Sequence, residues 1–322
     1  MEIISSCTPT ILKDAASSLR SGNLIAFPTE TVYGLGADAT NEHAIAKLYQ
    51  AKGRPADHPL IVHISSIANL DMWARDIPEY AIKLARKFWP GPMTLILPRT
   101  NLAKEFITGH QDSVAIRVSS HPVAVSLLKE FESQGGLGVA APSANRFGKV
   151  SPTTAAAVFE ELSNYLSADD LILDGGRCQV GIESTIIDCT EKAPKILRPG
   201  VITSEVIFLQ TEILVKEKIT IGGQDVLRAP GLLDSHYSPN AKVFLSGTPE
   251  PGDGLIALKF YSTPKGVIRL ASPDNHSAYA QQLYAALRQA DNKCLKRVFV
   301  IPPIGRGIAV AINDRLVKCA EK

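Results

Sequence analysis

The chain has 322 residues, of which 45% are hydrophobic and 20% are charged, so it can build an ordinary globular core and is long enough for two domains. Its net charge of +2 gives no strong field for nucleic acid or an anionic membrane. The five cysteines are scattered without a Cys-x-x-Cys pair, which disfavours a zinc site. The N-terminus lacks the basic region of a signal peptide and no apolar run reaches the length of a membrane span, so we expect a soluble, cytoplasmic protein.

The first 200 residues alternate between short apolar runs and amphipathic helices. Thr8 followed by Pro9 predicts a helix start, because Thr is a favoured N-cap and Pro suits the first helical position. Since not every connection is helical, we expect an α/β fold with a twisted mixed sheet and flanking helices. Strands are expected at 24–27, 60–64, 94–97, 114–118, 138–141, 171–173, 185–188 and 196–197, and helices at 41–51, 79–88, 122–132 and 153–162.

A second, smaller α/β pattern begins after residue 240. Turn signals between residues 222 and 239 predict a linker. We therefore divide the chain into a catalytic domain at 1–205, a linker at 206–240 that passes near the catalytic cleft, and a C-terminal domain at 241–322. For the last part we expect a small Rossmann-like αβα arrangement. Its strands are expected at 242–245, 255–259, 267–270 and 298–301, and its helices at 277–290 and 307–319.

Two nucleotide-binding motifs are matched only in part. The stretch 34–39 fits G-x-G-x-x-A, but Pro28 ends the preceding strand early and the next helix starts only at Asn41, which disfavours a Rossmann cofactor site. Gly148-Lys149 resembles the end of a phosphate loop, but Ser or Thr does not follow it. The histidines show no H-x-x-x-H spacing, so we expect no metal bound by protein ligands.

The segment 27–36, Phe-Pro-Thr-Glu-Thr-Val-Tyr-Gly-Leu-Gly, follows a buried strand and is rich in hydroxyl groups. One interpretation is a tight turn whose Thr and Glu side chains cap backbone groups. The other is a ligand-binding loop at a strand end, in which Thr31 is the hydroxyl expected to contact a small polar ligand. The segment by itself leaves both interpretations open.

Four cations stand in positions that suggest a partner or a ligand. Lys52 and Arg54 follow a predicted helix, where they could simply complement its dipole. Arg117 lies within an apolar strand and Arg198 ends another, and a cation in such a place is paired or functional. Because Arg forms bidentate bonds with phosphate and carboxylate, the four together could neutralise a triphosphate and a carboxylate.

Hydroxyl and amide side chains gather near the ends of further strands. Ser143-Ala-Asn145 follows one predicted strand. Ser151 stands before a helix, where it is either a plain N-cap or part of a phosphate site at the helix N-terminus. Ser184 lies in the sequence Gly-Ile-Glu-Ser-Thr just before another strand, and it is a candidate ligand contact.

Taken together, these segments resemble the threonylcarbamoyl-AMP synthase family, the YrdC-like proteins. The resemblance covers the first 200 residues, and 235–239 (Ser-His-Tyr-Ser-Pro) and 314–316 (Asp-Arg-Leu) further resemble the long two-domain form of the family. The segments that carry the resemblance are 28–36, Lys52-x-Arg54 with Pro59-Leu-Ile61 and His63, Trp89-Pro-Gly-Pro-x-Thr94, Arg117, Ser143-x-Asn145, Gly181-Ile-Glu-Ser-Thr185 and Arg198-Pro-Gly200.

The resemblance implies an activity and its partners. Members of the family condense L-threonine, bicarbonate and ATP to threonylcarbamoyl-AMP and pyrophosphate, which is a nucleotidyl transfer. A partner transferase then moves the threonylcarbamoyl group to an adenosine of tRNA, and no stable nucleic-acid complex or membrane contact is expected. Mg2+ is expected to arrive bound to ATP, which requires few protein ligands.

The resemblance also assigns roles to residues of this sequence. Lys52 and Arg54 are the expected catalytic residues, and Tyr237 of the linker is expected to close over ATP. His58 stands where the family commonly has Asn, which is a departure at a nucleotide-binding position. Threonine is expected to contact Thr31, His63, Arg117 and Ser184, and ATP to contact Lys52, Arg54, His58, Ser143, Asn145, Ser151, Arg198 and Tyr237.

Two other functions are less well supported by the sequence. Carbamoyl-adenylate chemistry, as in hydrogenase-maturation proteins with a YrdC-like domain, is disfavoured because the zinc-finger cysteine pairs of those proteins are missing. An RNA-binding module is disfavoured by the low net charge and the lack of basic stretches interleaved with aromatic residues. The C-terminal domain could act as a lid, as a docking surface for a partner, or as structural support.

Overall fold

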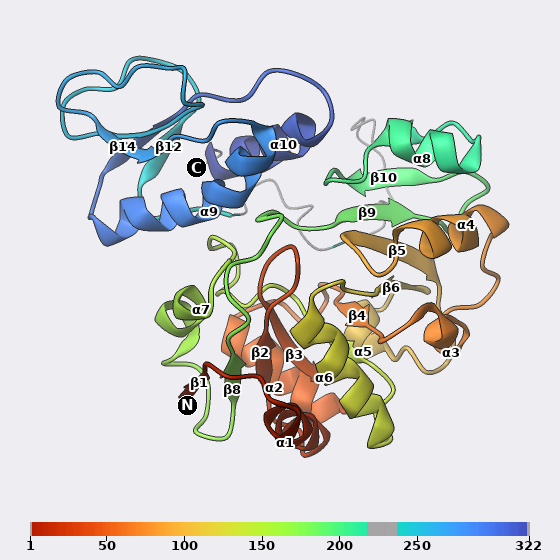
Figure 1. Ribbon diagram of the computed structural model, residues 1–322. Helices are drawn as coiled ribbons and strands as arrows, with labels where there is room; N and C mark the ends of the chain where they lie inside the picture. Colours follow the sequence, from red (N-terminus) through yellow and green to blue (C-terminus); the bar gives the residue numbers. More distant parts are fainter. Residues whose placement is uncertain (1, 218–228, 230–236, 321–322) are drawn as a thin grey trace.

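The structure, a computed structural model, describes residues 2–217, 229 and 237–320. Within these residues the chain forms a large mixed sheet followed by a small parallel sheet, both with flanking helices (Figure 1). The predicted α/β fold with a mixed first sheet is therefore confirmed. In the described part of the chain, no helix is both long enough and apolar enough to span a bilayer.

The large sheet has eleven strands within the described ranges. β2 runs antiparallel to β3, whereas β4 is parallel to β6 and β5 is parallel to β9. In spatial order the strands are β1 (Glu2–Ile4), β8 (Leu171–Leu173), β2 (Ile25–Phe27), β3 (Gly34–Asp38), β7 (Val139–Ala140), β4 (Ile61–His63), β6 (Ser113–Arg117), β5 (Met93–Pro98), β9 (Thr185–Asp188), β10 (Lys195–Arg198) and β11 (Lys216–Glu217).

Helices cover this sheet on both faces. The first helix has the predicted N-cap, Thr8, and the second begins after Asn41, whose side chain accepts a hydrogen bond from the backbone N–H of Ala44. The helices α3, α5 and α8 are short and were not predicted. The helices of this domain are α1 (Pro9–Arg20), α2 (Glu42–Lys52), α3 (Leu70–Trp73), α4 (Glu79–Phe88), α5 (Glu105–Thr108), α6 (Pro122–Ser133), α7 (Ala155–Leu162) and α8 (Ser204–Thr211), with a 3-10 turn at Ile67–Asn69.

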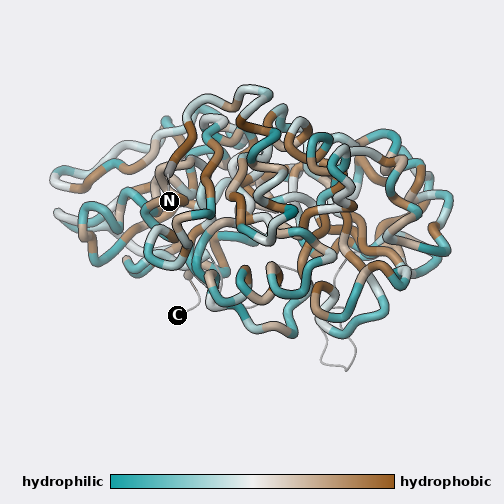
Figure 2. Tube along the Cα trace, turned by 90° about the horizontal axis from the view of Figure 1, so that it is seen from below, coloured by the Kyte–Doolittle hydropathy of each residue, from teal (hydrophilic) through white to brown (hydrophobic). Residues whose placement is uncertain are grey.

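The two faces of the sheet have different covers. On one face α1 and α6 pack against apolar residues that include Ile25, Phe27 and Val139. On the other face α2, α4 and α7 pack against residues that include Leu35 and Val62. Figure 2 shows that the brown hydrophobic segments run mainly through the interior, while the teal hydrophilic segments lie mainly on the outside. The core is thus divided between the two faces of the sheet.

One part of the sheet carries no helix over it among the described residues. This part lies on the face that α1 and α6 cover elsewhere, and its apolar residues, among them Ile61 and Ala115, form a small separate cluster. Side chains two apart along a strand point to the same face, so His63 and Arg117 project from this face as well. The strand pattern therefore brings polar side chains to an uncovered part of the sheet.

The C-terminal domain is built on four parallel strands. Its two helices pack against each other and against the face that carries Val243, Ile256 and Val298. The opposite face carries Leu255 and Phe299, and residues of the loop 257–267 pack on it. The predicted Rossmann-like parallel sheet is present, but a loop replaces its second helical layer. The elements are β12 (Lys242–Phe244), β13 (Gly254–Ile256), β14 (Ile268–Ala271), α9 (His276–Asn292), β15 (Arg297–Val300) and α10 (Ile308–Ala320).

The segment predicted as a linker, 206–240, begins with regular structure. Most of α8 lies in it and packs on α4, and β11 pairs in parallel with β10, so the large sheet extends to residue 217. Residues 218–228 and 230–236 of the predicted linker lie outside the described residues. At the C-terminal end of the segment, Ser238 forms a bridge with Lys149, and β12 begins four residues later. The chain therefore touches the large domain again just before the small one starts.

Candidate active site

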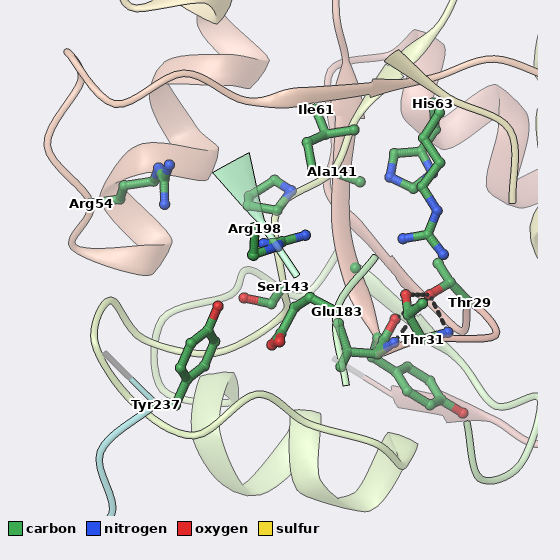
Figure 3. Close-up of a pocket in the computed structure, with 15 residues that line it drawn as sticks. Thr29, Thr31, Arg54, Ile61, His63, Ala141, Ser143, Glu183, Arg198 and Tyr237 are labelled. Atoms are coloured by element: carbon green, nitrogen blue, oxygen red, sulfur yellow. Dashed lines mark hydrogen bonds between the residues drawn. The ribbon is translucent and has the colours of Figure 1, made fainter. Parts of the chain in front are cut away.

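A cavity opens on the uncovered part of the large sheet and has an empty volume of about 540 Å3, counted out to its mouth. Figure 3 shows Thr29, Thr31 and His63 at one end, which we call the Thr31 end. Arg117 belongs to this end as well, because it is the register neighbour of His63 and pairs with Glu30. Arg54 and Tyr237 lie at the other, the Arg54 end, with Arg198 and Glu183 between the ends. The lining residues are Thr29, Thr31, Val32, Tyr33, Gly34, Arg54, Ile61, His63, Arg117, Ala141, Pro142, Ser143, Glu183, Arg198 and Tyr237.

The loop between β2 and β3 is shaped by the hydroxyl of Thr29. Its Oγ1 donates to the carbonyl of Val32 at 2.6 Å and accepts hydrogen bonds from the backbone N–H groups of Thr31 and Val32 at 3.2 Å. The hydroxyl of Thr31 lies 2.8 Å from that of Thr29 and lines the cavity. Thr29 therefore caps the turn, as one interpretation of this segment predicts, and Thr31 lines the cavity, while its contact with a ligand stays a prediction.

Arg117 on β6 is buried and paired with Glu30 of the same loop. Its Nη2 lies 2.8 Å from Glu30 Oε1, while Glu30 Oε2 accepts hydrogen bonds from the Ser119 hydroxyl at 2.5 Å and the Ser120 N–H at 3.1 Å. Burial alone would raise the pKa of Glu30, but the charge of Arg117 and the bond from Ser119 bring it below its ordinary value. Glu30 therefore stays ionised and holds the guanidinium of Arg117 at the cavity wall.

His63 on β4 is the register neighbour of Arg117 and is also buried. Burial, and then the charge of Arg117, lower the pKa of His63 to about 3, so the ring is neutral at physiological pH. Its Nδ1 has no hydrogen-bond partner among the described residues, and the ring packs edge-on against Phe27 at 5.9 Å between centroids. A neutral imidazole held in this way can form one directional hydrogen bond with a ligand.

Arg54 brings a positive charge to the opposite end of the cavity. Its Nη2 donates to the carbonyl of Pro59 at 2.9 Å, and its guanidinium lies 5.6 Å from the ring centre of Phe147. Burial lowers the pKa of Arg54 to about 10, which leaves the side chain charged at neutral pH. In the described part of the chain, Nε has no hydrogen-bond partner, and the charge of Asp57, which raises the pKa of Arg54, has a smaller effect than burial. An anionic ligand would supply that missing partner.

Lys52 lies beneath the neighbouring loop and does not line the cavity. Its ammonium donates to the backbone carbonyls of Ser143 and Asn145, and it is only 2% exposed. Burial, and then the charge of Arg54, lower the pKa of Lys52 well below its ordinary value. The amide of Asn145 donates to the carbonyls of Arg146 at 2.7 Å and Lys149 at 2.9 Å. Lys52 and Asn145 thus shape the loop that brings Ser143 to the cavity wall.

Arg198 and Glu183 lie side by side in the middle of the cavity (Figure 3). Arg198 donates from Nε to the carbonyl of Ser184 at 3.0 Å and from Nη2 to its hydroxyl at 3.1 Å. The Ser184 hydroxyl also lies 2.8 Å from that of Thr94. Glu183 Oε1 accepts a hydrogen bond from the Ser151 hydroxyl at 2.7 Å. Ser184 and Ser151 are therefore behind the lining residues, which they hold in place.

The structure brings the predicted site residues together, but in two layers. His58 does not line the cavity, and its ring packs edge-on against Phe147 at 5.3 Å between centroids. Ser151 is not the N-cap of α7, because Thr154 has that role. Which substrate each residue contacts stays a prediction. The cavity is lined by Thr31, Arg54, His63, Ser143, Arg117, Arg198 and Tyr237, whereas Lys52, His58, Asn145, Ser151 and Ser184 do not line it.

Sequence analysis missed two carboxylates that organise the site. Glu30 orients Arg117, and Glu183 lines the cavity beside Arg198. Each stands in a segment that sequence analysis had singled out, next to Thr31 and Ser184 respectively. The available signal was an acidic residue in a segment next to a predicted strand, since Glu is almost never fully buried unless it is paired. A paired partner could then have been sought among the arginines.

The arrangement of charges indicates the kind of ligand. Arginines line both ends and the middle, and Glu183 is the one carboxylate among the described lining residues. Both of its oxygens are engaged, one by Ser151 and the other by Tyr284 and Arg315. In the described ranges no group of three His, Cys, Asp or Glu side chains could hold a metal ion. The cavity therefore suits a ligand with several negative charges together with a small polar molecule.

Comparisons with known proteins divide the chain between β10 and α8, so α8 and β11 of the large sheet fall in the second match. Residues 17–200 match the family model of Sua5, YciO and YrdC proteins, whose description reads "Telomere recombination". Residues 202–321 match the model described as "Threonylcarbamoyl-AMP synthase, C-terminal domain". The two matches leave little of the chain unassigned.

Individual relatives match over almost the whole chain. The threonylcarbamoyl-AMP synthase of Pyrococcus abyssi is 39% identical over 96% of this chain and 94% of its own length. That of Bacillus subtilis is 37% identical over 96% of this chain and 92% of its own length. Among solved structures, P. abyssi Sua5 complexed with L-threonine matches with a TM-score of 0.89 and 36% identity, over 99% of this chain and 98% of that one.

Proposed function

The chain belongs to the threonylcarbamoyl-AMP synthase family, and from this premise we propose that it makes threonylcarbamoyl-AMP and pyrophosphate from L-threonine, bicarbonate and ATP. In this proposal the product passes to a transferase that modifies an adenosine of tRNA in the cytoplasm. The enzyme then acts as a nucleotidyltransferase that binds ATP, and it needs no stable complex with nucleic acid.

One observation carries the proposal: a single cavity has a polar end lined by Thr31 and His63 and, across from it, an end with a buried arginine whose Nε has no hydrogen-bond partner among the described residues. The P. abyssi relative whose structure contains L-threonine shares the fold over 99% of this chain. This supports assigning threonine to one end of the cavity. ATP would then occupy the other, where Arg54 and Ser143 lie.

At the Thr31 end the side chains suit an α-amino acid and its carbamate. We assign the threonine carboxylate to Arg117, because Glu30 holds that guanidinium in place and a bidentate bond fixes the position of a carboxylate. The Thr31 hydroxyl and the neutral ring of His63 remain for the other polar groups of threonine. A neutral ring does not repel an incoming ammonium group, whereas a charged one would.

The chemistry is a condensation followed by a displacement. The amine of threonine combines with bicarbonate to give a carbamate and water. A carbamate oxygen then attacks the α-phosphorus of ATP, a new O–P bond forms, and the bond to the β-phosphate oxygen breaks to release pyrophosphate. Arg198 lies between the two ends, where the α-phosphate would meet the carbamate (Figure 3). Its charge would stabilise the negative charge that develops there, while the cavity supplies positioning.

Arg54, Ser143 and Tyr237 are assigned to the nucleotide and its outer phosphates. Lys52 acts on the same loop from below, through the carbonyls of Ser143 and Asn145, and its predicted direct contact with ATP remains part of the proposal. Mg2+ would arrive on the phosphates of ATP, because the described residues offer no free carboxylate set for a metal. No step of the proposed reaction is assigned to a protein-bound ion.

The test is pyrophosphate release from ATP by the purified chain, with and without L-threonine and bicarbonate. The proposal predicts release that requires both. Arg54→Ala should lower it by about a hundredfold, the scale of a lost charge-assisted contact. Arg99→Ala is a matched control: Arg99 also donates to a backbone carbonyl and also has a buried Nε without a hydrogen-bond partner among the described residues, but it lies outside the cavity. If folded protein released pyrophosphate at the same rate with and without L-threonine, the proposal would be contradicted.

A further inference from the structure

The C-terminal domain places a charged side chain against the back of the cavity. Arg315 on α10 is 0% exposed, and its Nε donates to Glu183 Oε2 at 3.0 Å. Its Nη1 donates to the carbonyl of Pro199 at 2.9 Å. Glu183 precedes Ser184, and Pro199 follows Arg198. One guanidinium from the second domain thus ties together the two segments that carry the central groups of the site.

A second side chain of the same domain converges on the same carboxylate. The hydroxyl of Tyr284, on α9, donates to Glu183 Oε2 at 2.9 Å. The other oxygen, Oε1, accepts from Ser151 at 2.7 Å. Glu183 therefore links two helices of the C-terminal domain to Ser151 of the large domain, and it lines the cavity while doing so.

The cluster also receives the end of the linker. The ring of Tyr237 stacks on that of Tyr284 at 5.7 Å between centroids, and the Arg315 guanidinium lies 5.6 Å from the centre of the Tyr237 ring. The thiol of Cys319 donates to the Tyr237 carbonyl at 3.1 Å. Tyr237 itself lines the Arg54 end of the cavity. The nucleotide side of the site is thus built on α9 and α10, although its lining residues precede both helices.

The carboxylate at the centre of this cluster stays charged. Burial alone would raise the pKa of Glu183, but the charges of Arg315 and Arg198 bring it to about 2. A buried charge is stable only while its partners are in place, so a change in any partner moves the carboxylate or leaves its charge uncompensated. Such a movement would reach Ser151 through its hydrogen bond, and Arg198 through its charge and its bonds to the adjacent Ser184.

We propose that Arg315 and Tyr284 are positioning residues for the nucleotide: they fix Glu183, and through it Ser151 and Arg198, and so set the affinity of the site for ATP. The inference rests on the proposed function. It assigns the C-terminal domain a role in the reaction as a support of the nucleotide site. The polar contacts of the Thr31 end should be independent of it, because their supports, Glu30 and Ser119, belong to the large domain.

Tyr284→Phe tests the inference with the loss of a single hydroxyl. Its Kd for ATP should rise about fivefold, the scale of one ordinary lost hydrogen bond, with the Kd for L-threonine unchanged. Tyr279→Phe is the matched control, because Tyr279 lies on the same helix, is equally buried, and donates its hydroxyl to the carbonyl of Ile301 within its own domain. The control should lose a comparable amount of stability and keep its affinity for ATP.

A double variant tests whether Tyr284 acts through the carboxylate. Glu183→Gln should weaken ATP binding, and adding Tyr284→Phe to it should weaken binding no further. Arg315→Lys, which keeps the charge but cannot reach both Glu183 and Pro199 with a fork of donors, should raise the Kd for ATP by about tenfold or more.

The inference is overturned if Tyr284→Phe binds ATP as tightly as the parent chain, or if Tyr279→Phe weakens ATP binding to the same degree. Independent effects of Glu183→Gln and Tyr284→Phe in the double variant would also overturn it. These outcomes are separable from a failure of the proposed function. In that case the parent chain itself would release no threonine-dependent pyrophosphate.

Discussion

The two ends of the cavity are supported in different ways. At the Thr31 end, Arg117 is held by Glu30, and Glu30 by Ser119 and Ser120, all within the large domain. In the middle and at the Arg54 end, Glu183 and Tyr237 rest on side chains of α9 and α10. The polar supports of the first end lie within one domain, although Val32 of its loop packs in an apolar cluster with the C-terminal domain, whereas the supports of the second come from both domains. With the proposed assignment of threonine and ATP to the two ends, amino-acid recognition should be separable from domain docking, and nucleotide recognition should not.

The largest effect that can sharpen this contrast is expected for Arg117→Met. Loss of the guanidinium removes the proposed carboxylate contact, so kcat/KM for L-threonine should fall by at least about a hundredfold, the scale of a truncated buried charge pair. The Kd for ATP, measured by calorimetry, should stay within about twofold. Since the substitution strands the Glu30 carboxylate, Arg117→Met combined with Glu30→Gln should recover folding stability without recovering activity. An equal loss of ATP affinity would break the contrast.

Glu30→Gln should have the next largest effect. The amide keeps the shape but loses the charge that orients Arg117, so KM for L-threonine should rise about tenfold while KM for ATP holds. Glu132→Gln is a closely matched control: Glu132 also accepts hydrogen bonds from a serine hydroxyl and a backbone N–H, both of Ser65, and it does not line the cavity. If the control changed KM for threonine as much, the effect could not be assigned to Arg117.

Competition between L-serine and L-threonine probes the apolar side of the Thr31 end. Val32, Ile61 and Ala141 line the cavity and can contact the methyl group that serine lacks. One methyl group is worth only about 1–3 kcal/mol, so kcat/KM should favour threonine by about tenfold. Initial rates of pyrophosphate release with each amino acid give this ratio. Discrimination far beyond that would show a steric or polar mechanism that this account does not contain.

The smallest effect concerns stability and pH. His63 has a pKa of about 3 in the folded chain against 6.5 for an ordinary histidine, so below pH 6.5 the unfolded chain binds a proton that the folded chain does not. The stabilisation that comes from keeping His63 neutral is therefore present above pH 6.5 and is lost on acidification. The free energy of unfolding should fall by about 1 kcal/mol when the pH is lowered by one unit from 6.5. Burial also lowers the pKa of His121, which adds a loss of the same sign.

Denaturant unfolding of the parent chain and of His63→Asn at about pH 7.5 and about pH 5.5 isolates the contribution of His63. The parent should lose more stability than the variant between the two pH values. Equal losses would show that the ring is charged or exposed in the folded chain, which would remove the argument for a neutral partner at the Thr31 end.

Much of the large domain follows from local patterns in the sequence. Alternating apolar runs located β5 and β6, and cap residues located the starts of α1 and α2. β3 was missed because its sequence, Gly-Leu-Gly-Ala-Asp, lacks the branched and aromatic residues typical of strands. Packing requires one of its glycines: a Cβ at Gly36 would lie 2.8 Å from side-chain atoms of Phe27 and Val139.

The sequence predicted which residues gather at the site better than it predicted which of them line the cavity. Sequence patterns brought Arg54, Arg117 and Arg198 together, and the cavity contains all three. They could not show that Lys52 and Ser184 lie behind the wall, since burial depends on how loops fold over one another. Nor could they show the contact of Glu183 with Arg315, which lies 132 residues further along the chain. The single helical layer of the C-terminal domain was likewise invisible, because the loop that replaces the other layer carries no distinct pattern.

The most direct test of the separate supports is one set of equilibrium titrations. L-threonine and ATP, each alone, are titrated into the parent chain, Glu30→Gln and Tyr284→Phe. The account predicts a crossed result, in which Glu30→Gln weakens threonine binding only and Tyr284→Phe weakens ATP binding only. If each variant weakened both ligands to the same extent, the two ends would form one cooperative unit, and the division of labour between the domains would be contradicted.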